Sequence, residues 1–385
     1  MSDRPFELRA LDGTNPLGFL AALGTLVTLA QRGVAGARLR WRQARTWVPV
    51  LEGTGADDER ALAEAVAEGL RGEPVADDAE RARERAQRGM EKARTAIKRK
   101  RDEIGRRRSS RSARAEAEGR ELRPLEQEYE ARRRAWLEAL RRAVPRPELA
   151  LGARLDCTPK EYREHAAALL VAAGHAEREA LDMLAAFGSD ACRRSKGGTI
   201  DPTPFCFVSG GGNQEFLDTV RKLSYKVAPD RIYQALFEPW PYRDEKLSLR
   251  WDPVEDRRYA LLDRDPSDDG ARTVWMANLL AYRALALFPA APTGRGLAAA
   301  GWREADDEPG RQRWFTWPLW DSPAGADVVR SLLGARELAD PRPDCDVLRA
   351  RGIAAVYRAE RIEVGRQPNS KLNFSPARAL CSRWR

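Results

Sequence analysis

The residues with the clearest chemical potential form one basic tract, ARTAIKRKRDEIGRRRSSRSARA, at residues 93–115. Between Lys92 and Arg114 the sequence holds 11 lysines and arginines but only two acids, a net charge of +9 over 23 residues. Cations this dense repel one another, so we expect an anion to be their partner. Nucleic acid is the favoured anion, contacted through phosphates without reading of the bases. The predicted contacts are Lys98, Arg99, Lys100, Arg101, Arg106, Arg107, Arg108 and Arg111.

The distribution of charge along the chain sets this tract apart. The whole sequence of 385 residues carries a net charge of +9, with a pI of about 9.5. The segment 80–136 holds 20 basic and 11 acidic residues, so the remainder holds 47 of each and is neutral. A solvated helix face is the alternative explanation, because acids and bases nearly balance in the second half of this segment.

A glycine-rich stretch, FVSGGGNQEFLDTVRKL from Phe207, offers a second candidate for backbone contact. Its glycines lead into a helix predicted at residues 214–226, and amides at a helix start can hold a phosphate. Arg221 and Lys222 follow one to two turns later. The same pattern is typical of a tight turn. The residues of this second predicted contact are Gly210, Gly211, Gly212, Asn213 and Gln214.

Catalytic signatures do not stand out, so we predict no enzyme activity, no metal and no cofactor. The two histidines, His165 and His175, are ten residues apart and about 80° out of line on a helix, which favours structural roles. A run of acids between residues 252 and 269 favours ion-paired turns over a metal site, since arginines interrupt it. Those acids are Asp252, Glu255, Asp256, Asp263, Asp265, Asp268 and Asp269. Trp314, Trp317 and Trp320 favour core packing over base stacking.

The elements that must position these residues follow from apolar periodicity and caps. Asn15, Pro16 and Gly33 bound a helix that is apolar on most sides. Residues 37–43 and 46–53 are predicted to pair as a strand hairpin, and residues 57–72 to form an amphipathic helix. Further helices are expected at residues 161–188, 273–287 and 326–333.

A helical hairpin is predicted for the charged segment itself. Met90, Ile97 and Ile104 repeat every seven residues. The stretch RRRSSRS, with Gly105 at its edge, is predicted to break the helix before a second narrow apolar stripe. That second stripe consists of Leu122, Leu125, Tyr129, Trp136 and Leu140. We therefore expect a mixed α+β body, residues 1–79 and 146–385, into which residues 80–145 are inserted as a basic helical hairpin.

Cysteine usage and hydropathy bear on the compartment. Five scattered cysteines without a CxxC pair fit neither a disulfide framework nor a zinc finger, which predicts a reducing cytoplasm. The sequence contains no apolar run of twenty residues, so no contact with a membrane is expected.

Several stretches of the body resemble the large-subunit-like, Csb-type proteins of type I CRISPR surveillance complexes, subtype I-G, formerly I-U. They are LDGTNPLGFLAALGTL, FVSGGGNQEFLDTVRKL, WDPVEDRRYALLDRDPS, FTWPLW and LRARGIAAVYRAERIEVG, together 74 of the 385 residues. The segment 80–144 shows no such resemblance. The resemblance implies a non-catalytic subunit in antiviral defence, with guide RNA, target DNA, other effector subunits and a separate helicase-nuclease as partners.

Two other functions stay open at this level. The chain could be a scaffold that docks proteins without touching nucleic acid. It could also be an enzyme that binds a divalent cation through the carboxylates around Asp252.

Overall fold

The structure is a computed structural model that describes residues 4–107, 110–172, 174–194, 198–208, 215–254, 272–294, 296–304, 313–364 and 371–382. The chain divides into two compact units. The first, called the body, comprises residues 1–72 and 153–385, and the second, called the hairpin unit, comprises residues 73–152. Helices and small antiparallel sheets together confirm the predicted mixed α+β class.

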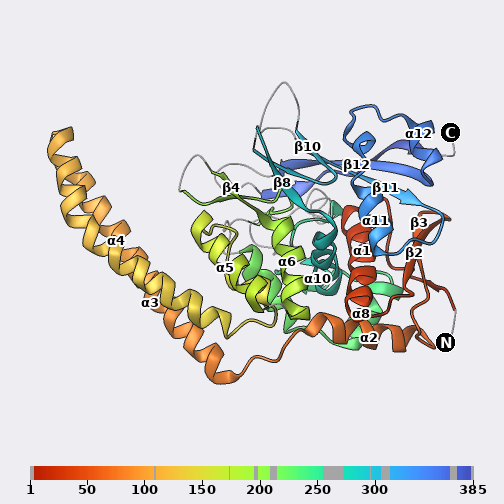
Figure 1. The fold of residues 1–385 in the computed structure, drawn as a ribbon, viewed down its shortest axis with the longest axis horizontal. Coiled ribbons are helices and arrows are strands. Elements are labelled where there is room, and N and C mark those ends of the chain that lie inside the picture. The colour runs from red at the N-terminus through yellow and green to blue at the C-terminus, as the bar shows by residue number, and fades with distance from the viewer. Residues whose placement is uncertain are drawn as a thin grey trace, which may run out of the picture. The chain divides into compact units, whose positions relative to one another are not determined.

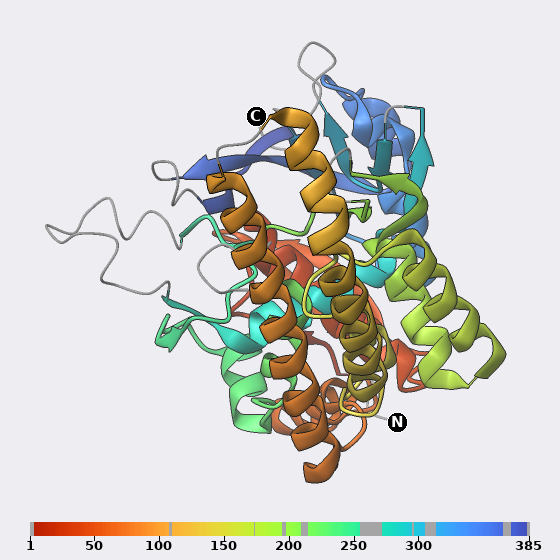
Figure 2. The same cartoon turned by 90° about the vertical axis from the view of Figure 1, so that its left-hand side faces the viewer.

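Two long helices make up most of the hairpin unit, and they lie side by side in both views (Figures 1 and 2). They are α3 (Asp77–Arg106) and α4 (Arg111–Arg141), followed by the short helix η1 (Pro147–Leu151). The Ser110 hydroxyl caps α4 by accepting a hydrogen bond from the amide of Ala113. The apolar stripes predicted from the sequence are buried at Met90, Ile104, Leu122, Trp136 and Leu140.

The centre of the body is α1 (Pro16–Gln31), whose residues from Pro16 to Leu29 are all buried. Asn15 caps this helix as predicted, because its side chain accepts hydrogen bonds from the amides of Leu17 and Gly18. Helix α10 (Trp275–Arg283) packs against α1. A Cβ on Gly24 would lie 1.6 Å from the carbonyl oxygen of Leu280, so this glycine permits the close approach of the two backbones.

Two antiparallel sheets complete the body core. In the smaller sheet, β3 (Trp47–Glu52) lies between β1 (Phe6–Glu7) and β2 (Arg38–Gln43), which confirms the predicted strand hairpin. In the larger sheet, β11 (Arg313–Trp320) and β12 (Ile353–Val364) pair along most of their length. Its other strands are β10 (Trp302–Glu304), β13 (Lys371–Phe374) and β14 (Arg378–Ser382).

Two of the three tryptophans of β11 confirm the predicted core packing, whereas Trp314 is partly exposed. Trp317 and Trp320 are 0% and 1% exposed, and their indole nitrogens donate hydrogen bonds to the carbonyl oxygens of Gly13 and Leu39. The Trp317 ring stacks on Phe19 of α1, with centroids 5.7 Å apart. Strand β11 and the N-terminal segment therefore share one aromatic core.

The helix predicted over residues 161–188 is wrong as a single element. The structure has α5 (Pro159–Ala172) and α6 (His175–Phe187), and Gly174 lies in an extended conformation as the N-cap of α6. Glycine favours such a break because its backbone is unusually free. Apolar residues continue at helical spacing on both sides of Gly174, so the sequence pattern does not reveal where the helix ends. The predicted helix at residues 326–333 is α11 (Ala326–Leu333).

Smaller elements connect these layers. Helix α2 (Glu59–Arg71) packs against α8 (Pro229–Phe237), and α7 (Phe216–Ser224) lies within the predicted span of residues 214–226. The other short helices are η4 (Ala284–Leu287), η5 (Arg336–Ala339) and α12 (Cys345–Ala350). The remaining strands are β4 (Gly188–Arg193), β5 (Ile200–Pro202), β6 (Asp244–Glu245), β7 (Arg272–Thr273), β8 (Ala290–Thr293) and β9 (Gly296–Ala299).

A disulfide corrects the expectation drawn from the cysteines. Cys345, at the start of α12, and Cys381, on β14, are bonded with their Cα atoms 5.6 Å apart. The two residues are 36 positions apart in sequence, and the pairing of β14 with β12 brings them together. Cysteine spacing alone therefore could not exclude a disulfide. None of the helices in the described ranges has the length and hydrophobicity needed to cross a bilayer.

Candidate nucleic-acid interface

Part of the basic tract is already neutralised inside the hairpin unit. Lys100 lies 2.9 Å from a carboxylate oxygen of Glu103 and 3.8 Å from one of Glu121. Arg107 lies 2.7 Å from Glu103 and 2.6 Å from Glu121. Arg101 pairs with Glu126 of α4 at 3.4 Å. Acids of the second helix thus compensate three of the predicted phosphate contacts, Lys100, Arg101 and Arg107.

The carboxylates of this cluster respond to their cationic neighbours. Hydrogen bonds from Lys100 and Arg107 lower the pKa of Glu103 to about 2. The hydrogen bond from Arg107 also lowers the pKa of Glu121, and the two acids raise the pKa of Arg107. Glu103 and Arg107 are exposed and Glu121 is partly exposed, so salt screens these interactions.

Four of the other predicted contacts differ from these three. Lys98, Arg99, Arg106 and Arg111 are exposed, and none of them forms an ion pair with another described residue. Arg108 lies outside the described residues. The predicted set is therefore divided by its environment into paired and unpaired cations, although the sequence makes them look equivalent.

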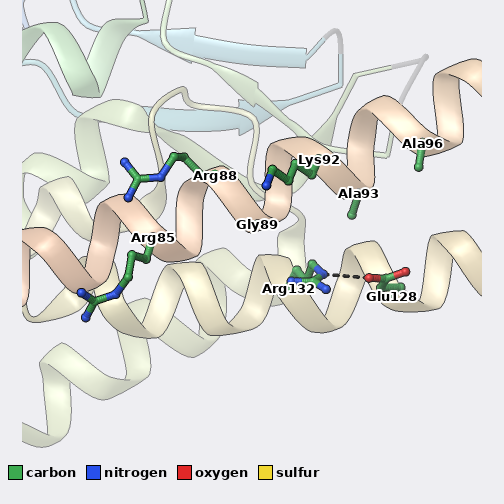
Figure 3. A pocket seen from close by; sticks show the side chains of 8 residues that line it. All are labelled: Arg85, Arg88, Gly89, Lys92, Ala93, Ala96, Glu128 and Arg132. Atoms are coloured by element: carbon green, nitrogen blue, oxygen red, sulfur yellow. Dashed lines mark hydrogen bonds and ion pairs between the residues drawn. The ribbon is translucent and has the colours of Figure 1, made fainter.

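Further cations that sequence analysis missed line a shallow groove between α3 and α4 (Figure 3). The groove is bordered by Arg85, Arg88 and Lys92 of α3 and by Arg132 of α4, with Glu128 as its acid. Arg132 Nε donates to a Glu128 carboxylate oxygen at 2.8 Å, whereas Arg88 lies 3.7 Å from Glu84. In the part of the chain that the structure describes, Arg85 and Lys92 have no ion-pair partner.

Small residues keep this groove open. Gly89, Ala93 and Ala96 line the α3 side, and a Cβ on Gly89 would lie 3.2 Å from a terminal nitrogen of Arg132. A side chain there would displace the guanidinium. The signal that could have found Arg85 and Lys92 is their seven-residue spacing from Arg99 and Arg106, the same period as the apolar stripe.

The second predicted contact, Gly210 to Gln214, lies outside the described residues. The two cations expected to assist it lie on α7 and are described. Arg221 and Lys222 each approach the Asp218 carboxylate to 2.6 Å. Burial opposes ionisation of Asp218, but hydrogen bonds from Lys222 and Arg221 outweigh it and lower its pKa. The charge of both cations is therefore partly compensated within α7.

Asp252, the first acid of the predicted cluster, is fully buried. One of its carboxylate oxygens accepts hydrogen bonds from the Asn15 side-chain amide at 2.9 Å and the Val254 amide at 3.0 Å. The other oxygen accepts one from the Tyr242 hydroxyl at 2.7 Å. Asp252 thereby holds the residue that caps α1, which is a structural role.

The remaining acids of that cluster, from Glu255 onward, lie outside the described residues. Within the described ranges, no group of three or more histidine, cysteine or acidic side chains is arranged to hold a metal ion. His165 is buried, and His175 Nε2 lies 2.6 Å from the Gln31 carbonyl oxygen and 3.1 Å from Glu179. Both histidines therefore occupy positions that suit the structural roles predicted for them.

Comparisons with known proteins identify no family for this chain. A scan against protein-family models and a search of curated proteins both found no match. The function must therefore be argued from the site.

Proposed function

We propose that this chain is a non-catalytic nucleic-acid-binding subunit that contacts phosphates through its hairpin unit. Following the resemblance of its body, we place it in a type I CRISPR interference complex of the cytoplasm. Guide RNA and target DNA would be its nucleic-acid partners there, alongside the other effector subunits and the helicase-nuclease.

One observation carries the proposal: exposed cations on α3 and at the start of α4 that have no ion-pair partner among the described residues. Lys98, Arg99, Arg106 and Arg111 are the predicted residues in this condition. Each retains a full positive charge in water, and phosphates bind such cations with release of condensed counterions. Paired cations contribute less, because a phosphate must displace their carboxylate partners.

The test is the salt dependence of binding. The purified full chain is titrated with labelled 25-nucleotide RNA, single-stranded DNA and duplex DNA between 50 and 400 mM salt. If roughly six phosphates are neutralised, the logarithm of the association constant falls with the logarithm of salt with a slope of about −5 for duplex and about −4 for a single strand.

Two outcomes would separate the alternatives. A slope near zero, or no binding at 50 mM salt, overturns nucleic-acid contact and leaves the protein-docking scaffold. Purification of the chain from cells that hold its neighbouring genes tests the complex itself. We expect RNA to remain with the chain at low salt and to be lost in a high-salt wash.

A further inference from the structure

Four of the cations of α3 that have no ion-pair partner among the described residues fall into one row. Arg85, Lys92, Arg99 and Arg106 are each seven residues apart, and all four are exposed. Seven residues correspond to two helical turns less about 20°, so successive members lie almost above one another, about 10.5 Å apart. Within the described residues none of the four has an ion-pair partner. We call these four residues the cation row.

We propose that the cation row binds the sugar-phosphate backbone of one extended nucleic-acid strand, an assignment that rests on the proposed function. The groove beside Arg85 and Lys92 is also lined by Arg88 and Arg132, each of which already has a glutamate partner (Figure 3). Because the row includes Arg85 and Lys92, it extends beyond the tract at residues 93–115, toward the start of α3.

The shape of the row favours a single strand over a duplex. Arg85 and Arg106 are 21 residues apart, or about 30 Å along the helix axis. That length is close to one turn of B-form DNA, about 34 Å, over which each backbone winds around the duplex axis. A straight row would therefore meet a given duplex strand near its ends only. An extended single strand has no fixed winding and can follow all four cations.

The paired cations supply a matched comparison on the same hairpin unit. The paired set consists of one lysine and two arginines, Lys100, Arg101 and Arg107. Three members of the cation row have the same composition, namely Lys92, Arg99 and Arg106. Replacing either trio by glutamine removes the same charge and the same side-chain types. The two trios differ in their partners, because only the paired set is neutralised by carboxylates, those of Glu103, Glu121 and Glu126.

The experiment compares two triple variants of the full chain with wild type. They are Lys92→Gln, Arg99→Gln, Arg106→Gln and, as the control, Lys100→Gln, Arg101→Gln, Arg107→Gln. Loss of three phosphate contacts lowers the salt slope on single-stranded RNA or DNA by about 2. If affinities converge near 1 M salt, the row variant binds about 100-fold more weakly than wild type at 0.1 M. The control variant should lose less affinity than the row variant, by a factor of at least about 10, because its three cations are already paired with glutamates. The carboxylates that it leaves unpaired act over a short range, since 0.1 M salt screens charges beyond about 10 Å.

The outcomes distinguish this inference from the proposed function. Equal losses of affinity in both variants would overturn the role of the cation row. Nucleic-acid binding would then depend on the overall charge of the hairpin unit. A salt-independent wild type overturns the proposed function itself. Wild-type binding that is tighter for duplex, with the row variant losing affinity for duplex alone, overturns the assignment to a single strand. Circular dichroism of both variants checks that α3 and α4 remain folded.

Discussion

Two buried arginines of the body contrast with two exposed arginines of the cation row in the hairpin unit. In the body, Arg283 is 1% exposed and its guanidinium lies 3.1 Å from Glu179, and Arg358, 3% exposed, donates to Thr316 and to two backbone carbonyl oxygens. In the hairpin unit, Arg99 and Arg106 are exposed and have no ion-pair partner among the described residues. Burial requires a partner for each charge, whereas solvent does not.

This difference predicts which substitutions affect stability and which affect the proposed nucleic-acid binding. The body carries a net charge of only +2 and is held together by apolar and aromatic contacts. The hairpin unit carries +7 of the net charge of +9 and has only a narrow apolar stripe. Changes to the body should therefore affect folding, and changes to exposed hairpin cations should affect binding alone. The following predictions test that separation, beginning with the largest effect.

Truncation of the aromatic core should cost the most. Trp317→Ala removes a fully buried ring that stacks on Phe19 and Phe315 and donates to Gly13. We expect the free energy of unfolding to fall by about 3–5 kcal/mol, as for other buried aromatic truncations. Urea denaturation followed by tryptophan fluorescence measures it.

The matched change in the hairpin unit is Arg99→Gln. It should alter the free energy of unfolding by no more than about 0.5 kcal/mol, because the side chain is exposed and unpaired within the described structure. The separation between the two regions breaks down if Arg99→Gln destabilises the chain as much as Trp317→Ala.

Two glycines in helices should respond to alanine with opposite signs. Gly24→Ala places a methyl group against the Leu280 carbonyl oxygen, so α1 and α10 must move apart. We expect a loss of about 1–3 kcal/mol. Gly119→Ala in α4 meets no atom within 4 Å and should stabilise the hairpin unit by up to about 1 kcal/mol.

Hydrogen exchange of peptides from each region reports the two glycine effects separately. Faster exchange in α1 and α10 is expected for Gly24→Ala, and slower exchange in α4 for Gly119→Ala. A destabilising Gly119→Ala would mean that α4 is packed on that side, contrary to the open space around the residue.

The smallest effect concerns acid. Lys100 and Arg107 depress the pKa of Glu103 to about 2, so their stabilising contribution is complete above its ordinary pKa of 4.5. It is lost as pH falls from 4.5 through about 2. Arg107→Gln should raise the pKa of Glu103 but leave it below 4.5, because Lys100 remains.

Carboxyl chemical shifts followed by NMR from pH 7 to pH 1.5 measure this pKa. Arg99→Gln is the control and should change it much less, since Arg99 forms no ion pair with Glu103. An identical pKa in wild type and Arg107→Gln would show that the ion pair does not form in solution.

The stretches that carry the family resemblance meet in the core. LDGTNPLGFL contacts FTWPLW through the hydrogen bond from Trp317 to Gly13, and contacts WDPV through the one from Asn15 to Asp252. Residues 15 and 252 are 237 positions apart in the chain. The described parts of those motifs therefore report how the body packs.

Local patterns were sufficient for much of this fold. The cap at Asn15, the strand hairpin at residues 38–52 and the seven-residue apolar repeat depend on neighbours within a few turns or across one tight turn. The sequence pattern predicts α5 and α6 as one helix because apolar periodicity continues on both sides of Gly174. The disulfide from Cys345 to Cys381 could not be predicted from the sequence, because the pairing of distant strands brings its two cysteines together.

The sequence by itself determined that the excess charge belongs to one helical segment, since charge and helical periodicity are properties of the chain read locally. Only the tertiary structure decided which cations are unpaired. Whether Arg107 meets Glu121 depends on the register of α3 against α4, which buried side chains such as Ile104 and Leu122 set. That register neutralises Lys100, Arg101 and Arg107 and leaves the row from Arg85 to Arg106 free to bind an anion.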